Sequence, residues 1–171
     1  NDGVLVETEV WYYEANRLIL KKEFDLTLEF DTYMQIMARG GTAWELAKNI
    51  GIPQKTIDLA RAKRDILDQN FITTKDVTIP IGNRVIKERI KQYEMAIITT
   101  SRREDFELVH KSRGITDYMQ FCLCVGEYRR AKPYPDPYLD GMKKFKARKE
   151  ECIIVEDSQR GLTSAVNAEI Q

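Results

Sequence analysis

Small polar, acidic and basic residues that suit phosphoryl transfer follow or separate the apolar segments of this sequence. One apolar run ends in residues 99–101 (Thr-Thr-Ser) and another in residues 156–158 (Glu-Asp-Ser). Residues 1–3 (Asn-Asp-Gly) form an acidic loop, and Lys132 opens a proline-rich segment. Carboxylate oxygens bind Mg²⁺, and the cation acts with a lysine to neutralise phosphate oxygens as charge shifts. Because Asp and Ser also cap helices, neither cluster identifies a site by itself.

The elements around these residues predict an α/β core. Short apolar runs at residues 95–98, 121–125 and 152–155 do not alternate with polar residues, and helical segments lie between them. Such runs are typical of parallel strands that are buried on both faces. Ligands bind at the carboxyl ends of the strands in open parallel sheets, so polar residues that are distant in sequence can meet there.

The segment between the acidic loop and the first apolar run has an almost wholly helical pattern. Its expected helices span residues 9–23, 33–38, 43–49 and 54–70. Thr42 is a candidate N-cap for the third of them, and residues 78–82 are expected to form a turn or linker. The helices expected in the α/β part span residues 84–91, 103–113, 137–147 and the segment from 159 onward. Ser101 and Glu104 have the spacing of a capping box for the second of these.

The composition is that of an ordinary globular protein and excludes several functional classes. Of 171 residues, 43% are hydrophobic and 32% are charged, and 27 basic residues balance 27 acidic ones. This balance predicts no binding to nucleic acid or anionic membranes, and no apolar run approaches the ~20 residues of a membrane helix. Three cysteines are too few for a disulfide scaffold, which favours a reducing compartment. A single histidine, His110, disfavours a multi-histidine metal centre.

Both ends of the sequence predict that the natural protein continues beyond them. The sequence begins at Asn1 instead of Met, with residues from the middle of a motif, and it stops at Gln171 soon after a helical pattern. We therefore expect a first strand before Asn1 and further structure, including a strand, after Gln171.

Four segments, taken in order, resemble the motifs of the haloacid dehalogenase-like hydrolases. Residues 2–9 (Asp-Gly-Val-Leu-Val-Glu-Thr-Glu) resemble the first motif from its second aspartate onward, and Thr99 resembles the second motif. Residues 132–138 (Lys-Pro-Tyr-Pro-Asp-Pro-Tyr) resemble the third motif, and residues 156–161, with Glu-Asp-Ser and a final Gly, resemble the fourth. The helical block after the first motif resembles the helical-cap branch, which includes β-phosphoglucomutase-like phosphatases.

The resemblance implies a Rossmann-like parallel-sheet core with an inserted helical cap. The core would consist of residues 1–9 and 80–171, and the cap of residues 10–79. Closing the cap over the site would exclude water and complete a substrate pocket.

The resemblance also implies a role for each motif residue. The nucleophile would be an aspartate immediately before Asn1, and its attack would give an aspartyl-phosphate. Asp2 would protonate the leaving oxygen and later activate water. Thr99 and the backbone N–H of Thr100 would bind the phosphoryl group, and Lys132 would pair with the phosphate and the nucleophile.

Mg²⁺ is the cofactor that the resemblance implies. Asp2 would contribute its backbone carbonyl, and Glu156 and Asp157 would bind the ion directly or through water. The dehalogenase branch lacks the second aspartate of the first motif, so Asp2 favours phosphoryl over carbon–halogen chemistry. Ser158 is expected to cap the following helix.

The strongest candidate for substrate recognition in the cap is the segment of residues 39–42 (Arg-Gly-Gly-Thr). Its glycines allow close backbone approach, and Arg39 is the candidate substrate contact, although a plain turn between helices has more weight. Ala43 and Trp44 stand where sugar-phosphate mutases carry an arginine that clamps a second phosphate.

These features predict a cytoplasmic, Mg²⁺-dependent phosphatase that acts on a small phosphorylated metabolite, such as a sugar phosphate, through an aspartyl-phosphate. The alternatives are a phosphomutase of the β-phosphoglucomutase type and a catalytically silent relative that binds a ligand or a partner. Nothing in the sequence marks the oligomeric state, and a monomer is slightly favoured.

Overall fold

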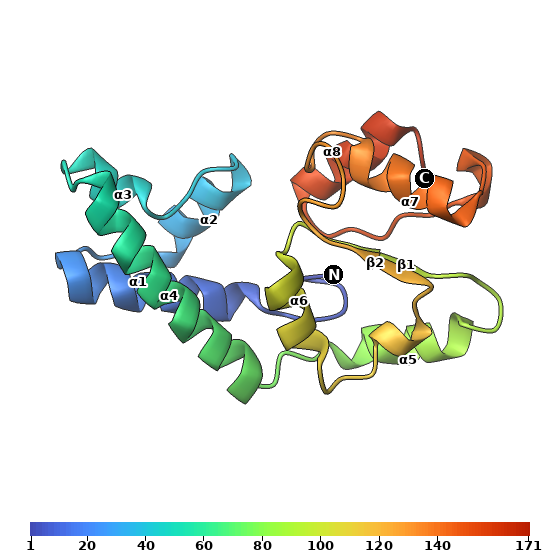
Figure 1. The fold of residues 1–171 in the computed structure, drawn as a ribbon, viewed down its shortest axis with the longest axis horizontal. Coiled ribbons are helices and arrows are strands. Elements are labelled where there is room, and N and C mark those ends of the chain that lie inside the picture. The colour runs from blue at the N-terminus through green and yellow to red at the C-terminus, as the bar shows by residue number, and fades with distance from the viewer. The chain divides into compact units, whose positions relative to one another are not determined.

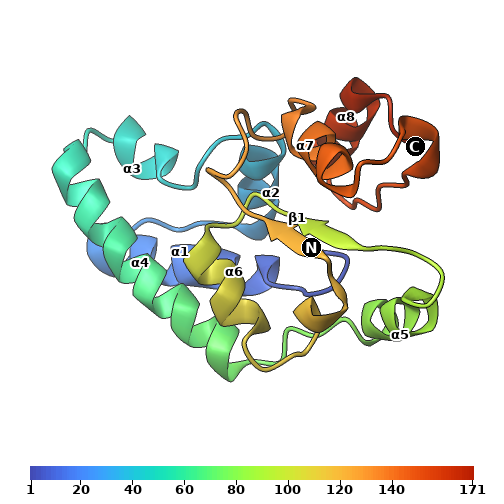
Figure 2. The same ribbon diagram turned by 45° about the vertical axis from the view of Figure 1, so that its right-hand side comes forward.

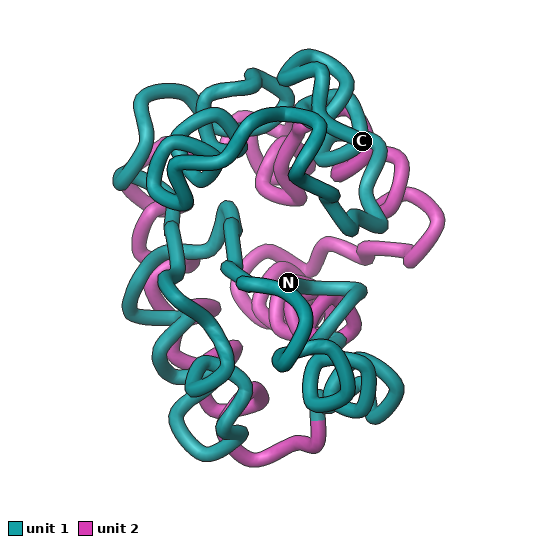
Figure 3. Tube along the Cα trace, turned by 90° about the vertical axis from the view of Figure 1, so that its right-hand side faces the viewer, with its two compact units in different colours: residues 1–7, 77–171 teal, residues 8–76 magenta.

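The computed structural model describes all of residues 1–171 and divides into two compact units (Figure 3). Unit 1 consists of residues 1–7 and 77–171, and unit 2 of residues 8–76. Since unit 1 contains both ends of the chain, unit 2 is an insertion into it. The structure contains no helix that combines the length and the apolar character required to cross a membrane.

Unit 2 is entirely helical, and its helices are those that the sequence pattern predicted (Figure 1). They are α1 (Glu9–Phe24), α2 (Phe30–Ala38), α3 (Glu45–Asn49) and α4 (Gln54–Thr74). Helices α1 and α4 make the most extensive contact of this unit. Its core includes the buried side chains of Leu20, Tyr33, Trp44 and Ile57, so Trp44 contributes to packing.

The predicted cap of α3 by Thr42 is wrong. The helix begins at Glu45, with Trp44 at the N-cap and no side-chain capping bond. The Glu45 carboxylate instead accepts a hydrogen bond from the Thr42 backbone N–H, at 3.1 Å between Oε1 and N. The Glu45 N–H, which a Thr42 hydroxyl would cap, donates to the Thr42 backbone carbonyl at 2.9 Å, so no hydroxyl cap forms.

Unit 1 contains a parallel pair of strands with helices around it (Figure 2). Strand β1 (Ala96–Ile98) pairs with β2 (Phe121–Leu123), with Ala96 opposite Phe121. The helices of this unit are α5 (Pro80–Arg89), α6 (Arg103–His110), α7 (Asp136–Phe145) and α8 (Gln159–Ala168), with short 3₁₀ turns at Thr116–Tyr118 and Lys149–Glu151. Helix α6 lies in the connection between the two strands, as parallel pairing requires.

A third strand was predicted at residues 152–155, and the structure does not contain it. The segment pairs with no strand, although the Ile154 N–H donates to the Gln171 carbonyl at 2.7 Å. Ile153 and Val155 are 73% and 70% exposed. An apolar run forms a strand only where a neighbouring backbone pairs with it along its length, and the only sheet of residues 1–171 consists of β1 and β2.

Two local expectations in unit 1 are also corrected. Helix α6 has Arg102 at its N-cap and no side-chain capping bond, so Ser101 and Glu104 form no capping box. The Ser101 hydroxyl lies 3.0 Å from the Thr99 hydroxyl, and the Ser101 N–H donates to the same Thr99 hydroxyl at 3.1 Å. Helix α5 begins at Pro80, inside the predicted linker, because proline fits the first turn of a helix.

Candidate active site

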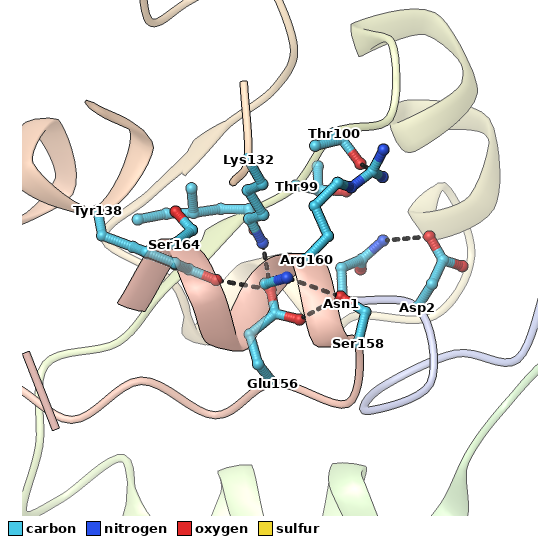
Figure 4. Close-up of polar contacts among 12 residues, drawn as sticks. Asn1, Asp2, Thr99, Thr100, Lys132, Tyr138, Glu156, Ser158, Arg160 and Ser164 are labelled. Carbon is cyan, nitrogen blue, oxygen red and sulfur yellow. Dashed lines mark hydrogen bonds and ion pairs between the residues drawn. The ribbon is translucent and has the colours of Figure 1, made fainter. Parts of the chain in front are cut away.

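The four segments singled out in the sequence meet within unit 1, at the end of β1 (Figure 4). The amino group of Asn1 lies among the charges of Asp2, Lys132, Glu156 and Asp157. Residues of the first, third and fourth motifs therefore lie around the backbone nitrogen of Asn1.

Lys132 and Glu156 form the centre of this cluster as a buried ion pair. Their side chains are 7% and 8% exposed, and the ammonium group of Lys132 contacts Oε1 of Glu156. Lys132 also donates to the carbonyl of Ile98, the last residue of β1, at 3.1 Å. This bond holds the positive charge one residue before Thr99.

Tyr138 contacts both members of the pair. Its hydroxyl donates to Oε1 of Glu156 at 2.6 Å, and the Lys132 ammonium lies 4.8 Å from the centre of its ring. Burial, and next the bond to Glu156, raise the pKa of Tyr138, so its hydroxyl stays protonated and remains a donor. Burial tends to raise the pKa of Glu156, but the hydrogen bonds from Lys132 and Tyr138 outweigh it, and this pKa is below its ordinary value.

Replacing Tyr138 with phenylalanine is expected to lower the free energy of unfolding by about 1.5–3 kcal/mol, since a hydrogen bond to a charged group is lost. A lowered carboxyl pKa stabilises the fold above the unfolded pKa of about 4.3, and this stabilisation is lost as the pH falls through the folded pKa. The difference in the free energy of unfolding between the wild-type protein and Tyr138→Phe should therefore be largest at pH 7 and should decrease below about pH 4.3. Denaturant titrations of both proteins across this range measure it. An advantage that stays constant with pH would contradict the assigned hydrogen bond.

Thr99 lies directly after β1 and is held in place by its backbone. It is 4% exposed, its N–H donates to the Leu123 carbonyl at 2.9 Å, and its carbonyl accepts from the Tyr128 hydroxyl at 2.8 Å. Its own hydroxyl is 3.0 Å from that of Ser101. The end of β1 therefore holds the Thr99 hydroxyl one residue after the Ile98 carbonyl that accepts from Lys132.

Ser158 caps helix α8, as the sequence predicted. Its hydroxyl accepts from the Gly161 N–H and donates to Oε2 of Glu156, each at 3.1 Å. A Cβ on Gly161 would overlap the Glu156 carboxylate, so only glycine allows this close approach. The start of α8 therefore contacts Oε2 of Glu156, while Lys132 contacts Oε1.

The acidic loop at the start of the chain contacts Asp157. Gly3 has a φ of +67°, and a Cβ at this position would overlap the Asp157 carboxylate. The loop closes on itself, because the Gly3 N–H donates to the Val6 carbonyl at 2.8 Å. Glycine therefore allows the loop that carries Asp2 to pack directly against Asp157.

The sequence profile described as haloacid dehalogenase-like hydrolase matches residues 2–171. The chain belongs to the haloacid dehalogenase-like hydrolases. The family inferred from the four ordered motifs is thus confirmed, and the protein is an enzyme of this hydrolase family.

Individual relatives of this haloacid dehalogenase-like hydrolase include named phosphatases. Fructose-1-phosphate phosphatase YqaB of Escherichia coli is 24% identical, over 96% of this chain and 87% of its own length. (DL)-glycerol-3-phosphatase 2 of Arabidopsis thaliana is 25% identical, over 98% of this chain and 73% of its own length. The structure of a CbbY mutant from Rhodobacter sphaeroides in complex with xylulose-(1,5)-bisphosphate has a TM-score of 0.82 and 17% identity, and covers 99% of this chain and 80% of that one. These comparisons confirm the predicted fold class, a Rossmann-like α/β core with a helical insertion.

The metal-ligand set of this hydrolase is only partly assembled by side chains. Residues 1–171 contain no group of three or more His, Cys, Asp or Glu side chains that could hold a metal ion. Both carboxylate oxygens of Glu156 already accept hydrogen bonds, which favours a role as the partner of Lys132. The Asp157 carboxylate and the Asp2 backbone carbonyl fit Mg²⁺, which is usually bound through one or two carboxylates together with other oxygens, waters and substrate phosphates. Metal binding by Asp2, Glu156 and Asp157 stays a prediction.

Arg39, the predicted substrate contact of the insertion, lies in unit 2 at the C-terminal end of α2. Its guanidinium forms an ion pair with Glu45, the residue that also holds Thr42. Gly40 follows with a φ of +76°, as in a turn. Substrate binding by Arg39 stays a prediction.

Arg160, which the sequence pattern did not single out, lies near the end of β1. Its guanidinium is 3.4 Å from the hydroxyl of Thr100, and Figure 4 shows its side chain extending from α8 toward Thr99 and Thr100. The available signal was its position inside the fourth motif, between Ser158 and Gly161. Because α8 begins directly after the fourth motif, a cation in its first turn is expected to lie near the ends of the strands.

Proposed function

We propose that this protein is a Mg²⁺-dependent phosphatase that hydrolyses a small phosphorylated metabolite, such as a sugar phosphate, through an aspartyl-phosphate. The observation that supports this most directly is the buried Lys132–Glu156 pair, which fixes a lysine charge between the Asp2 loop and the end of β1. A fixed cation in a site of low dielectric stabilises charge on a transferring phosphoryl group. The substrates named for the two sequence relatives are also small phosphate esters.

The proposed nucleophile is the aspartate that the family resemblance places immediately before Asn1. A residue joined to the Asn1 amino group would begin among the charges of Asp2, Lys132 and Asp157. Its carboxylate would therefore have a cation beside it and an acid–base partner two residues later. Carboxylate attack on phosphorus divides one difficult displacement into two easier ones.

Asp2 is the proposed general acid and base. Its proton would go to the departing ester oxygen in the first step, and its carboxylate would take a proton from water in the second. Lys132 would hold the phosphoryl oxygens, and the hydroxyl of Thr99 and the backbone N–H of Thr100 would donate hydrogen bonds to them. Mg²⁺, held by the Asp2 backbone carbonyl and by Asp157 with Glu156 in support, would supply charge neutralisation at the same oxygens.

Unit 2 is proposed to act as the specificity cap, with Arg39 as a candidate substrate contact. A helical insertion of this kind can exclude water from a phosphoryl-transfer site and select the organic part of the substrate. The core motifs would then determine the reaction, and the insertion would determine which metabolite is accepted.

Phosphate release by the natural protein tests the proposal. We expect turnover with at least one small monoester from a panel that contains fructose 1-phosphate, glycerol 3-phosphate and p-nitrophenyl phosphate. EDTA should abolish this turnover, and added Mg²⁺ should restore it. A requirement for a bisphosphate activator, with little net phosphate release, would support a mutase instead. Absence of turnover with every ester, despite ligand binding, would support a silent relative.

A further inference from the structure

His110 is a buried residue that the proposed reaction does not use. It is the last residue of α6 and is 3% exposed, and its ring lies 4.6 Å from that of Phe106. Figures 1 and 2 both show the start of the chain beside α6. A residue 109 positions away in sequence therefore faces the loop that carries Asp2.

Two hydrogen bonds connect His110 to Asp2. Nε2 of His110 is 2.9 Å from Oδ1 of Asn1, and Nδ2 of Asn1 is 3.4 Å from Oδ2 of Asp2. Asn1 is thus held on one side by the imidazole and donates to the carboxylate on the other. Figure 4 shows the amide of Asn1 directed at this carboxylate.

The Asp2 carboxylate determines which atoms donate in these two hydrogen bonds. The carboxylate of Asp2 must receive a donor, so Asn1 turns its NH₂ toward Asp2 and its oxygen toward His110. Nε2 of His110 therefore carries the ring proton and donates it. Nδ1 is buried without a partner, which in this tautomer leaves only a lone pair unsatisfied. Burial lowers the pKa of His110 to about 4, so the ring is neutral near pH 7.

We propose that His110 is a positioning residue for acid–base catalysis, which holds the side chain of Asn1 so that Asn1 in turn holds the carboxylate of Asp2. This inference rests on the proposed function of Asp2. In the first step, a bond forms between the nucleophile carboxylate and phosphorus, the P–O bond to the leaving group breaks, and the proton of Asp2 goes to the departing oxygen. The orientation of the Asp2 carboxyl group therefore matters most when the leaving group needs that proton.

The leaving group provides a readout that separates positioning from general stability. An alkoxide leaves only with a proton, whereas p-nitrophenolate leaves without one. The kcat/KM value reports only the steps up to the first irreversible one, so it isolates leaving-group departure from the later hydrolysis of the intermediate. A merely structural role for His110 would lower kcat/KM for both kinds of ester by the same factor.

The test compares His110→Phe and His110→Gln with the wild-type protein on glycerol 3-phosphate, or the best alkyl ester of the panel, and on p-nitrophenyl phosphate. His110→Phe keeps the ring stacking but lacks the donor, and it should lower kcat/KM for the alkyl ester about 10- to 100-fold, as loss of an orienting hydrogen bond does elsewhere. The value for the aryl ester should stay within about threefold of wild type. His110→Gln offers an amide donor and should recover most of the loss.

Asn1→Leu tests the same connection from its other end and keeps every side chain of α6 unchanged. It should give the same selective loss, and the double variant His110→Phe/Asn1→Leu should be no worse than either single variant. Equal losses on both esters, or additive losses in the double variant, would overturn the inference. If the wild-type protein itself releases no phosphate, the proposed function has failed instead.

Discussion

Replacing Lys132 with methionine is expected to reduce kcat about 100- to 1,000-fold on every substrate, in line with removal of one fixed electrostatic group from an active site. The lysine is positioned before substrate arrives, because Ile98, Glu156 and the ring of Tyr138 all contact it. Its loss should affect aryl and alkyl esters alike, since both develop the same charge on the phosphoryl oxygens. Steady-state phosphate release measures the effect, and Lys91→Met is the matched control at an exposed lysine.

The same substitution is expected to destabilise the protein by about 3–5 kcal/mol, because it leaves the Glu156 carboxylate buried without its cation. Combining it with Glu156→Gln removes the unpaired charge and keeps a side chain that can bond to Tyr138 and Ser158. The double variant should therefore regain stability in denaturant titrations but not activity. Recovery of activity together with stability would show that Lys132 acts only on the fold.

The order of strands and helices was readable from the sequence because each element carries a local signal. The runs that became β1 and β2 are apolar without alternation, and the helix at α1 contains neither Gly nor Pro from residue 9 to residue 23. Because helices separate these runs, the strands were expected to be parallel, and the carboxyl ends of parallel strands lie at the same edge of a sheet. The meeting of Asp2, Thr99 and Lys132 segments follows from that topology.

The features that the sequence did not predict depend on partners that are distant in the chain. Residues 152–155 have the composition of a strand, but pairing needs a neighbouring backbone that a local pattern cannot supply. The bond from Tyr138 to Glu156 and the bond from His110 to Asn1 connect residues from different elements. Their residue types alone are equally compatible with ordinary core packing.

The capping errors have a related cause. Thr42 and Ser101 are good capping residues by type, yet in each case another polar group takes the place of the expected hydroxyl cap. The Thr42 backbone carbonyl accepts the Glu45 N–H, and the Ser101 hydroxyl bonds to the Thr99 hydroxyl. Competition among nearby acceptors is decided by geometry, whereas sequence spacing only lists the competitors.

Asp2→Asn is expected to lower kcat for alkyl phosphates about 100- to 10,000-fold, the range for removal of a general acid–base group. Asparagine has nearly the same size and can still accept the hydrogen bond from Asn1, so the loop should keep its fold. The amide can neither give the leaving oxygen a proton nor take one from water. Rates of phosphate release measure the loss, and Glu7→Gln, an exposed acid-to-amide change in the same segment, is the control.

The two duties assigned to Asp2 can be separated with p-nitrophenyl phosphate. Its leaving group needs no proton, so the first step should survive in Asp2→Asn while hydrolysis of the intermediate remains slow. Rapid mixing should then show a burst of p-nitrophenolate, close to one equivalent of enzyme, followed by slow turnover. A burst that disappears together with turnover would mean that Asp2 is needed for attack on phosphorus itself, through metal binding or loop structure, and the acid–base assignment would have to be abandoned.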